Sequence, residues 1–315
     1  MNLPVHATLA DAGEFGLIAE LVRRFPQGED VLVGPGDDAA VLGVPDGRVV
    51  VSTDLHVDTR HFRRDWMSAS DIGHKVAAAN LSDLNAMGGR ATALTVGLAA
   101  PADLPVAWAL ELAEGIADEC ALVGASVIGG DLTAADQVVI AVTALGSVAG
   151  DPVLRSGARP GDVLALAGRQ GWAAGGLAVL ARGFRSPRKL VEAYQRPAPP
   201  YTEGAVALAN GVTSMIDVSD GLLADVGHVA EASGVAVDVV SDSFEIAEPL
   251  QAVGAALGAD PLRFVLTGGD DHPLVATFPP GQVPERWTTI GSVSEGSGVT
   301  VDGTTYDGPT GHTHF

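Results

Sequence analysis

The sequence has little of several residue types, and each shortage narrows the kind of protein that it encodes. The single cysteine, Cys120, excludes an intrachain disulfide and a thiolate metal cluster, which is typical of a reducing compartment. No run of about 18 uninterrupted apolar residues occurs, so no transmembrane helix is expected. The N-terminus lacks a basic region followed by an apolar one, so no signal peptide is expected either. The sequence therefore predicts a cytoplasmic protein.

Basic residues are scarce as well. The chain has 18 Lys and Arg against 39 Asp and Glu, a formal net charge of −21. A protein this acidic repels nucleic acid and anionic membranes, so neither is an expected partner. It would also repel a phosphorylated small molecule, because two like unit charges about 4 Å apart cost about 4 kcal/mol at an effective dielectric of 20. Any anion bound near these acids therefore requires a divalent metal.

Length and composition predict two globular domains. The chain has 315 residues, of which 47% are hydrophobic and 18% charged, and it exceeds the usual size of a single core. Because aromatic residues make up only 5%, the core must consist mainly of Ala, Val and Leu. The turn-rich segment Ala149-Gly-Asp-Pro152 marks the boundary, which gives domains at 1–149 and 150–315.

Hydrophobic periodicity predicts where helices and strands lie. Ser70 is a candidate N-cap for one helix, and Gly88-Gly89 ends it. Helices are expected at 14–25, 70–87, 105–122 and from about 221 through 232. Strands are expected at 49–51, 91–98, 126–128, 137–147, 163–167, 214–217 and 264–266.

One local pattern recurs: an apolar strand, then a turn with Gly, Ser or Thr, then one or two Asp. Such ends converge on one edge in α/β architecture, where clustered carboxylates require bound cations. The alternative is a set of independent acidic turns, since Asp and Gly are common in turns. The pattern occurs at Asp37/Asp38, Ser52/Thr53/Asp54, Asp131, Asp217/Ser219/Asp220 and Asp270/Asp271, and a predicted helix adds Asp83.

Mg²⁺ suits such oxygen ligands and commonly takes its remaining ligands from substrate phosphates. The two lysines, Lys75 and Lys189, lie outside any P-loop context. A dinucleotide fingerprint, a zincin helix and a Gly-x-Ser-x-Gly elbow are also missing from the sequence. Phosphoryl transfer assisted by several Mg²⁺ ions is the chemistry that remains.

Motifs along nearly the whole chain resemble those of the thiamine-monophosphate kinase family, in the superfamily of aminoimidazole ribonucleotide synthetase and selenophosphate synthetase. Each motif is weak alone, and their ordered combination is specific. They are Gly34-Pro-Gly-Asp-Asp-Ala-Ala40, Ser52-Thr-Asp54, Asn80-Leu-Ser-Asp-Leu-Asn-Ala-Met-Gly88, Ile128-Gly-Gly-Asp131, Arg155-Ser-Gly-Ala-Arg-Pro-Gly-Asp162, Ile216-Asp-Val-Ser-Asp-Gly-Leu222 and Thr267-Gly-Gly-Asp-Asp271.

The resemblance implies an α+β fold of two α/β-type domains: an N-terminal sheet domain that pairs into a homodimer, and a C-terminal mixed-sheet domain with packed helices. It implies ATP as co-substrate, thiamine monophosphate as acceptor, several Mg²⁺ ions, and an active site in the cleft between the domains. Asp220 and Arg155 would be catalytic, Gly130, Asp131, Arg155 and Ser219 would contact ATP, and His61 and Asp270 would contact the vitamin phosphate. The metal ligands would be Asp38, Ser52, Thr53, Asp54, Asp83, Asp131, Asp217 and Asp220.

The acceptor would be a phosphate monoester, largely dianionic at neutral pH, so its oxygen needs no general base. Catalysis then consists of aligning two polyanions and offsetting their repulsion with metal and with Arg155.

Two segments depart from the family pattern. Asp270-Asp271-His272-Pro273 stands where the family commonly has Glu-Asp-Tyr-Glu. The tail offers His312, His314 and Phe315, with Tyr306 upstream, where the family often has Trp or Tyr. Which side chain contacts the thiamine rings is therefore left open.

Other interpretations remain. The chain could be another ATP-dependent synthetase of the superfamily with a different acceptor, or a non-catalytic scaffold that binds divalent cations. A selenophosphate synthetase is disfavoured because Cys120 lies in mid-helix and not near the N-terminus. Lys75 could reach a phosphate or pair with Asp71. The arginines beside His61, at 60, 63 and 64, could line a phosphate pocket or form a solvated loop.

Overall fold

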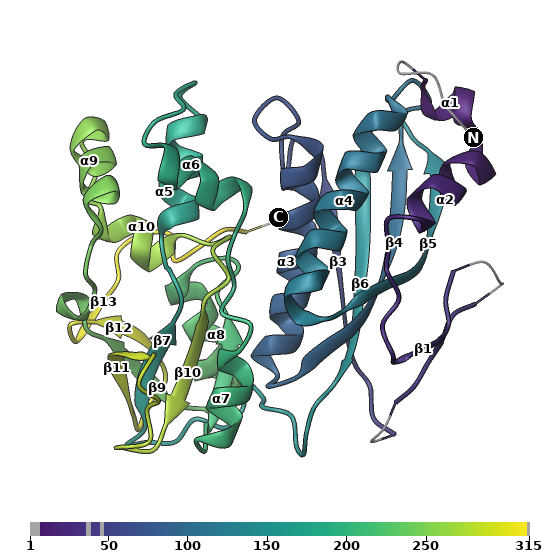
Figure 1. The fold of residues 1–315 in the computed structure, drawn as a ribbon. Coiled ribbons are helices and arrows are strands. Elements are labelled where there is room, and N and C mark those ends of the chain that lie inside the picture. The colour runs from purple at the N-terminus through teal and green to yellow at the C-terminus, as the bar shows by residue number, and fades with distance from the viewer. Residues whose placement is uncertain (1–6, 36–38, 45–46, 314–315) are drawn as a thin grey trace. The chain divides into compact units, whose positions relative to one another are not determined.

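The protein folds as two compact units in a computed structural model that describes residues 7–35, 39–44 and 47–313. Unit 1 comprises Met1–Leu84 and Arg90–Val148. Unit 2 comprises Asn85–Gly89 and Ala149–Phe315. Both units combine helices with β-sheet, so the expected α+β fold class is confirmed (Figure 1).

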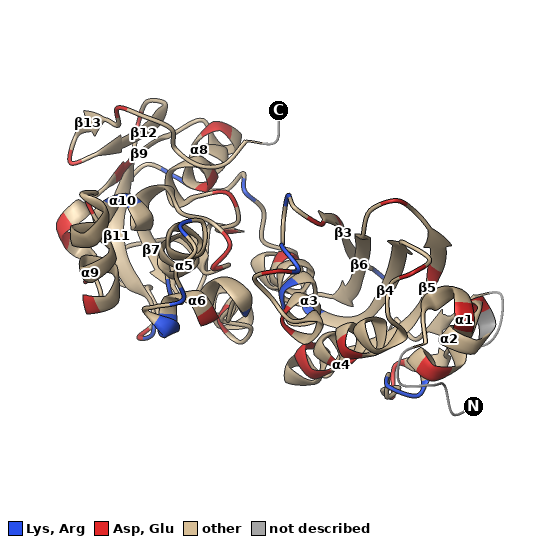
Figure 2. Cartoon of the chain, turned by 90° about the horizontal axis from the view of Figure 1, so that it is seen from above, with Lys and Arg blue, Asp and Glu red and all other residues tan. Residues whose placement is uncertain are grey.

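Unit 1 is built on a four-stranded sheet in the order β3-β6-β4-β5, in which β6 runs antiparallel to β3 and β4. Helices α3 and α4 lie along one face of this sheet (Figure 2). A short pair, β1 and β2, forms a separate two-stranded sheet. The elements are α1 Leu9–Ala12, α2 Glu14–Val22, β1 Val31–Val33, β2 Val41–Leu42, β3 Val50–Val57, α3 Ala69–Ala86, β4 Arg90–Ala100, α4 Val106–Val123, β5 Ser126–Ala134 and β6 Val139–Ser147.

Two glycines let α3 and α4 approach closely. A Cβ atom on Gly73 of α3 would lie 2.2 Å from the carbonyl oxygen of Leu112, and one on Gly115 of α4 would lie 2.1 Å from that of Ser70. Real side chains do not tolerate such distances, so only glycine fits this crossing. The crossing holds α3, which carries Asp83, against its neighbour.

Unit 2 is built on a seven-stranded mixed sheet in the order β13-β12-β9-β11-β7-β10-β8. All of its strand pairs are antiparallel except β12 with β9. The elements are β7 Val163–Ala167, α5 Trp172–Leu180, α6 Arg188–Gln195, α7 Glu203–Ala209, β8 Ser214–Asp217, α8 Leu222–Ser233, β9 Ala236–Val239, the 3₁₀ turn Ser241–Ser243, α9 Glu248–Leu257, α10 Leu262–Thr267, β10 Leu274–Phe278, β11 Thr288–Ser294, β12 Gly298–Val301 and β13 Thr304–Thr305.

The central strands of unit 2 are buried on both faces. In β7, Leu164 and Leu166 join the core under α8, whereas Ala165 and Ala167 join a second core with Ala207 of α7. This explains why β7 is a continuous apolar run without alternation. The buried sheet supports the acidic turn that follows β8.

Several sequence predictions about local structure are wrong. Residues 264–266 lie in helix α10 and not in a strand. This helix begins after Asp260-Pro261, a typical helix-start signal, and the Asp260 side chain accepts the N–H of Leu262 (3.0 Å). The N-cap of α3 is Ser68, which forms a reciprocal capping box with Asp71, and not Ser70. Helix α2 ends at Val22, before the predicted residue 25.

The triplet Ser52-Thr53-Asp54 also lies within a strand and does not follow one. Strand β3 pairs with β6 continuously from Val50 to Val57, so the hydrogen-bonded ladder runs through the polar residues. Asp131 likewise lies within β5. No helix in the described part of the chain is long and apolar enough to cross a membrane.

Candidate functional site

In unit 1, strand β3 and helix α3 bring two predicted metal ligands into contact. The Ser52 hydroxyl donates a hydrogen bond of 2.6 Å to Oδ2 of Asp83. Successive residues of a strand point to opposite faces, so Asp54 shares the face of Ser52. The pairing of Ser52 with Asp83, and the side on which Asp54 lies, match the sequence expectation of a shared oxygen-rich site.

Thr53 lies on the other face of the sheet. Its hydroxyl donates to the carbonyl of Val142 (3.0 Å) and lies 2.8 Å from the hydroxyl of Thr143, both on β6. Thr53 is therefore separated by the sheet from Ser52 and Asp83. A role in the same metal site is not supported within unit 1.

Asp131 is also separated from Asp54. Across the four paired strands Asp54 is aligned with Gly130, and Leu55 is aligned with Asp131. Aligned residues share a face of the sheet, so Asp131 lies on the face of Leu55, opposite to that of Asp54. Strands β3 and β5 are the two edges of the sheet, so three strand spacings, about 14 Å, lie between them. Gly130 fits beside β4 because a Cβ there would lie 1.9 Å from the carbonyl oxygen of Val96.

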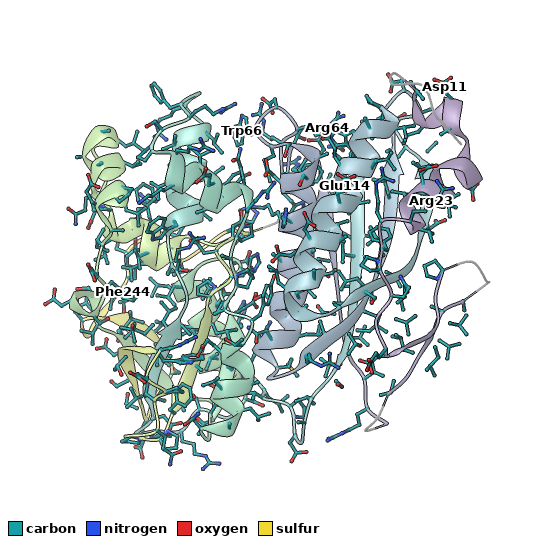
Figure 3. The ribbon with its side chains drawn as sticks, viewed as in Figure 1. Asp11, Arg23, Arg64, Trp66, Glu114 and Phe244 are labelled. Carbon is teal, nitrogen blue, oxygen red and sulfur yellow. The ribbon has the colours of Figure 1, made fainter. Side chains whose placement is uncertain are left out.

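The loop after β3 uses most of its charge internally. Arg64 donates to Oδ2 of Asp58 (2.6 Å), and the guanidinium of Arg63 lies 4.3 Å from the centre of the Trp66 ring. Arg64 and Trp66 of this loop are labelled in Figure 3. His61 accepts the N–H of Val57 at Nδ1 (3.0 Å). Arg63 and Arg64 therefore stabilise the loop that carries His61, whereas Arg60 is exposed.

In unit 2, the end of β8 brings Asp217 against His272. Nδ1 of His272 lies 3.1 Å from Oδ2 of Asp217, and both side chains are buried. His272 comes from the loop after α10 and has a positive φ of 52°, a conformation that non-glycine residues adopt rarely. The histidine at this departure from the family pattern therefore orients a predicted metal ligand.

The turn after β8 is organised by a carboxylate from the first turn of α8. Oδ2 of Asp225 accepts the backbone N–H groups of Ser219, Asp220 and Gly221, each at 3.1 Å. Burial raises the pKa of Asp225 to about 7, and the charges of Asp217 and Asp220 add to this, against the N–H bonds from Gly221 and Asp220. The backbone N–H groups of residues 219–221, which precede α8, are thus satisfied by Asp225.

Backbone contacts fix the same turn from two further segments. The N–H of Asp270 donates to the carbonyl of Ser219, and the N–H of His312 donates to that of Asp220, both at 3.0 Å. Gly269 makes this approach possible, because a Cβ there would lie 2.0 Å from the carbonyl oxygen of Ser219. The backbones of Ser219 and Asp270 are thus held together, and the C-terminal segment lies beside Asp220.

Arg155 lies elsewhere in unit 2. Its carbonyl accepts the hydroxyl of Ser233, at the C-terminal end of α8, and its side chain is exposed. Asp220 precedes the N-terminal end of this helix, whose 12 residues span about 18 Å. Within unit 2 the two residues predicted as catalytic are therefore at opposite ends of α8.

Asp271 holds the start of α5. Both of its carboxylate oxygens lie 3.0 Å from the backbone nitrogen of Ala173, in the first turn of that helix. Burial raises the pKa of Asp271 from 3.8 to about 7, although the N–H of Ala173 and the charge of Arg169 lower it. Between pH 4 and 7 the folded protein therefore keeps a proton that the unfolded chain releases.

We expect Asp271→Asn to change how stability depends on pH. Below about pH 4 Asp271 is protonated in both the folded and the unfolded state, so it does not change how the free energy of unfolding depends on pH. From about pH 4 to 7 only the unfolded chain releases this proton, so the free energy of unfolding falls by up to about 1.4 kcal/mol per pH unit. Asn cannot ionise, so the free energy of unfolding of the variant should increase relative to that of the wild type as pH rises. This difference should level off above pH 7. Urea unfolding at pH 5 and pH 8 measures this. Exposed Asp136→Asn is the control, and an offset equal at both pH values would contradict the raised pKa.

Within the described residues of either unit, no three His, Cys, Asp or Glu side chains lie together as one metal-binding group. Acidic residues are spread over both units (Figure 2). The predicted ligands instead form small sets of hard oxygen donors: Ser52 with Asp83 in unit 1, and Asp217 and Asp220, whose charges both act on Asp225, in unit 2. Asp37 and Asp38 lie outside the described residues.

Sequence reasoning missed the roles of Asp225, Asp271 and His272. Asp225 had a signal, because an acid in the first turn of a helix commonly satisfies backbone N–H groups at its start. Asp271 and His272 had none, because their partners Ala173 and Asp217 are more than 50 residues away along the chain.

Comparisons with known proteins come from family models, curated sequences and solved structures. Two family models match, "AIR synthase related protein, N-terminal domain" over residues 36–148 and "AIR synthase related protein, C-terminal domain" over residues 159–302. The thiamine-monophosphate kinase of Mycobacterium tuberculosis is 48% identical over 311 residues, covering 98% of this chain and 93% of that protein. The thiamine-monophosphate kinase of Corynebacterium glutamicum is 39% identical, covering 91% and 88%.

Solved structures of thiamine-monophosphate kinases are also similar to this chain. A crystal structure of thiamine-monophosphate kinase from Stenotrophomonas maltophilia matches with a TM-score of 0.80 at 33% identity, covering 92% of this chain and 95% of that one. The structure of AaThiL complexed with AMPPCP and TMP matches with a TM-score of 0.81 at 29% identity, covering 98% and 99%. The hydrogenase maturation protein HypE of Escherichia coli, at 18% identity and a TM-score of 0.74, shares the fold.

Proposed function

The chain belongs to the thiamine-monophosphate kinase family, within the AIR synthase related proteins, and from that membership we propose that it transfers a phosphoryl group from ATP to thiamine monophosphate. The product is thiamine diphosphate. The 48% identity over 98% of the chain carries this conclusion. The complex of AaThiL with an ATP analogue and TMP supports both substrates.

The residues of the chain position the reaction and do not need to activate the acceptor. A phosphate monoester is largely dianionic near neutral pH, so its oxygen is already a nucleophile. The work left to the protein is to align two polyanions and to offset their repulsion. The turn at Ser219 and Asp220 suits this, because its backbone is fixed by Asp225, Asp270 and His312.

The donor set fits Mg²⁺. The ligands that the family resemblance implies are Asp carboxylates and Ser or Thr hydroxyls, the hard oxygen groups that Mg²⁺ prefers, and each unit offers few of them, which leaves room for waters and phosphate oxygens. Ser52, Asp54 and Asp83 of unit 1 and Asp217 and Asp220 of unit 2 would hold the ions. Mg²⁺ would supply positive charge against the phosphates of both substrates.

An assay of the purified protein with ATP, Mg²⁺ and thiamine monophosphate tests the function. Thiamine diphosphate should form, and excess chelator should stop its formation. No diphosphate, or full turnover in excess chelator, would refute the proposal. A thermal shift with ATP that depends on Mg²⁺ would separate an enzyme from a scaffold that binds only cations.

The use of ATP also supports the expected cytoplasmic location.

We also propose that the protein forms a homodimer through the open face of the unit 1 sheet. This face exposes Val51 (57%) and Leu55 (64%), and apolar side chains so exposed on one face are typical of an interface. Asp131 lies on the same face, so a second sheet packed there would lie beside it.

Leu55→Asp should convert the dimer into monomer, because it places a charge in the proposed apolar interface. Size-exclusion chromatography with light scattering measures the mass. The control is Leu122→Asp on α4, a leucine of similar exposure (67%) on a helix, which should leave the dimer intact. A monomeric wild type, or a dimeric Leu55→Asp variant, would rule out this interface.

A further inference from the structure

The start of α8 carries three backbone N–H groups that point to one place. The segment Ser219-Asp220-Gly221 directs its N–H groups at a single atom, Oδ2 of Asp225, at 3.1 Å each. Helix starts with such convergent N–H groups commonly bind phosphate. Here the carboxylate of Asp225, only 3% exposed, occupies that position.

We infer that Asp225 is a positioning residue for phosphoryl transfer: its carboxylate takes the place of an external anion at the start of α8 and fixes the turn that presents Ser219 and Asp220. This inference rests on the proposed function. It assigns Asp225 a task that differs from metal binding, because the carboxylate of Asp225 accepts hydrogen bonds from three backbone N–H groups of the turn.

The consequence for substrate binding is specific. Phosphate oxygens cannot reach the N–H groups of residues 219–221, so they meet this turn only through the Ser219 hydroxyl or through cations held by Asp220. The carbonyls of Ser219 and Asp220 are also used, by Asp270 and His312. The backbone N–H and carbonyl groups of this turn therefore have hydrogen-bond partners within the protein. The position of the Asp220 side chain depends on Asp225, because Asp225 fixes this backbone.

Removal and replacement of the carboxylate test this inference. Asp225→Ala leaves three N–H groups without an acceptor and opens a space the size of a formate ion. Loss of such an orienting partner typically lowers metal affinity or activity 10- to 100-fold, so we expect kcat to fall by about that factor and the Mg²⁺ concentration for half-maximal rate to rise. Sodium formate should restore part of the rate and raise the thermal midpoint, relative to sodium chloride at equal ionic strength.

Asp225→Asn keeps an oxygen acceptor without the charge. This variant should fold, and its kcat should lie between those of the wild type and Asp225→Ala. Its Mg²⁺ requirement should be raised, and its KM for thiamine monophosphate should be unchanged. Glu231→Ala, an exposed acid on the same helix, is the matched control and should respond to neither salt.

Wild-type Mg²⁺ dependence in both Asp225 variants would overturn the inference, and so would formate effects equal to those in Glu231→Ala. Should Asp225→Ala fail to fold, the Mg²⁺ requirement of Asp225→Asn decides alone. A wild type that makes no thiamine diphosphate would refute the proposed function instead, while the formate-dependent thermal shift of Asp225→Ala would still test the positioning of the turn.

Discussion

Asp54→Asn and Asp220→Asn should each reduce turnover of thiamine monophosphate at least about 100- to 1000-fold, the usual effect of removing one group that stabilises charge in a transition state. Asn has nearly the shape of Asp, so each change removes a negative charge and leaves the packing intact. Asp54 comes from β3 of unit 1 and Asp220 from the turn before α8 of unit 2. The two variants therefore test one proposed metal ligand in each unit.

Steady-state rates across a Mg²⁺ titration, with thermal midpoints measured in parallel, check this result. The midpoints should stay near that of the wild type. Asp118→Asn, an exposed acid on α4, serves as the control and should retain full activity. Near wild-type rates in both Asp54→Asn and Asp220→Asn would contradict metal binding by these residues.

Gly115→Ala should destabilise the protein more than any single surface change. The new methyl group would lie 2.1 Å from the carbonyl oxygen of Ser70, so α4 must move away from α3. Overpacking of this kind costs about 1–3 kcal/mol or more, against a gain of about 1 kcal/mol in helix propensity. We expect the thermal midpoint to fall by several degrees, and activity to fall with it because α3 carries Asp83.

The same substitution at Gly227 is the matched control. Gly227 lies within α8, and apart from its chain neighbours and the adjacent backbone of that helix no described atom lies within 4 Å of where its Cβ would be. Gly227→Ala should therefore raise the thermal midpoint, since only the gain in helix propensity remains. A stable Gly115→Ala variant would show that the two helices can separate at little cost.

The sequence predicted the parts of the fold that depend on local patterns. The helix at 70–87 is α3 (Ala69–Ala86), and the strand at 163–167 is β7, because hydrophobic period and flanking glycines are local properties. It failed at 264–266, where a short apolar run has no period long enough to separate a strand from a buried helix. The Asp-Pro pair before α10 carried the missing signal.

The sequence supplies candidate site residues, whereas their arrangement depends on contacts between segments far apart in the chain. That Ser52 meets Asp83 agrees with the expectation, because both were assigned to one metal site. Whether Asp131 shares a face with Asp54 depends on the register of strands far apart in the chain, which no local motif encodes. The contact of His272 with Asp217 depends on a left-handed backbone at His272, which sequence pattern does not reveal.

The alternation along β3 has a consequence for how this protein can evolve. Acid and apolar residues occupy opposite faces with a period of two, Asp54 on one side and Leu55 on the other. A single-codon deletion inside β3 ahead of Ser52 would exchange the two faces, placing Leu55 on the side of Asp83 and moving Ser52 and Asp54 to the opposite side. Within β3, only insertions or deletions of two residues keep each following side chain on its own face of the sheet.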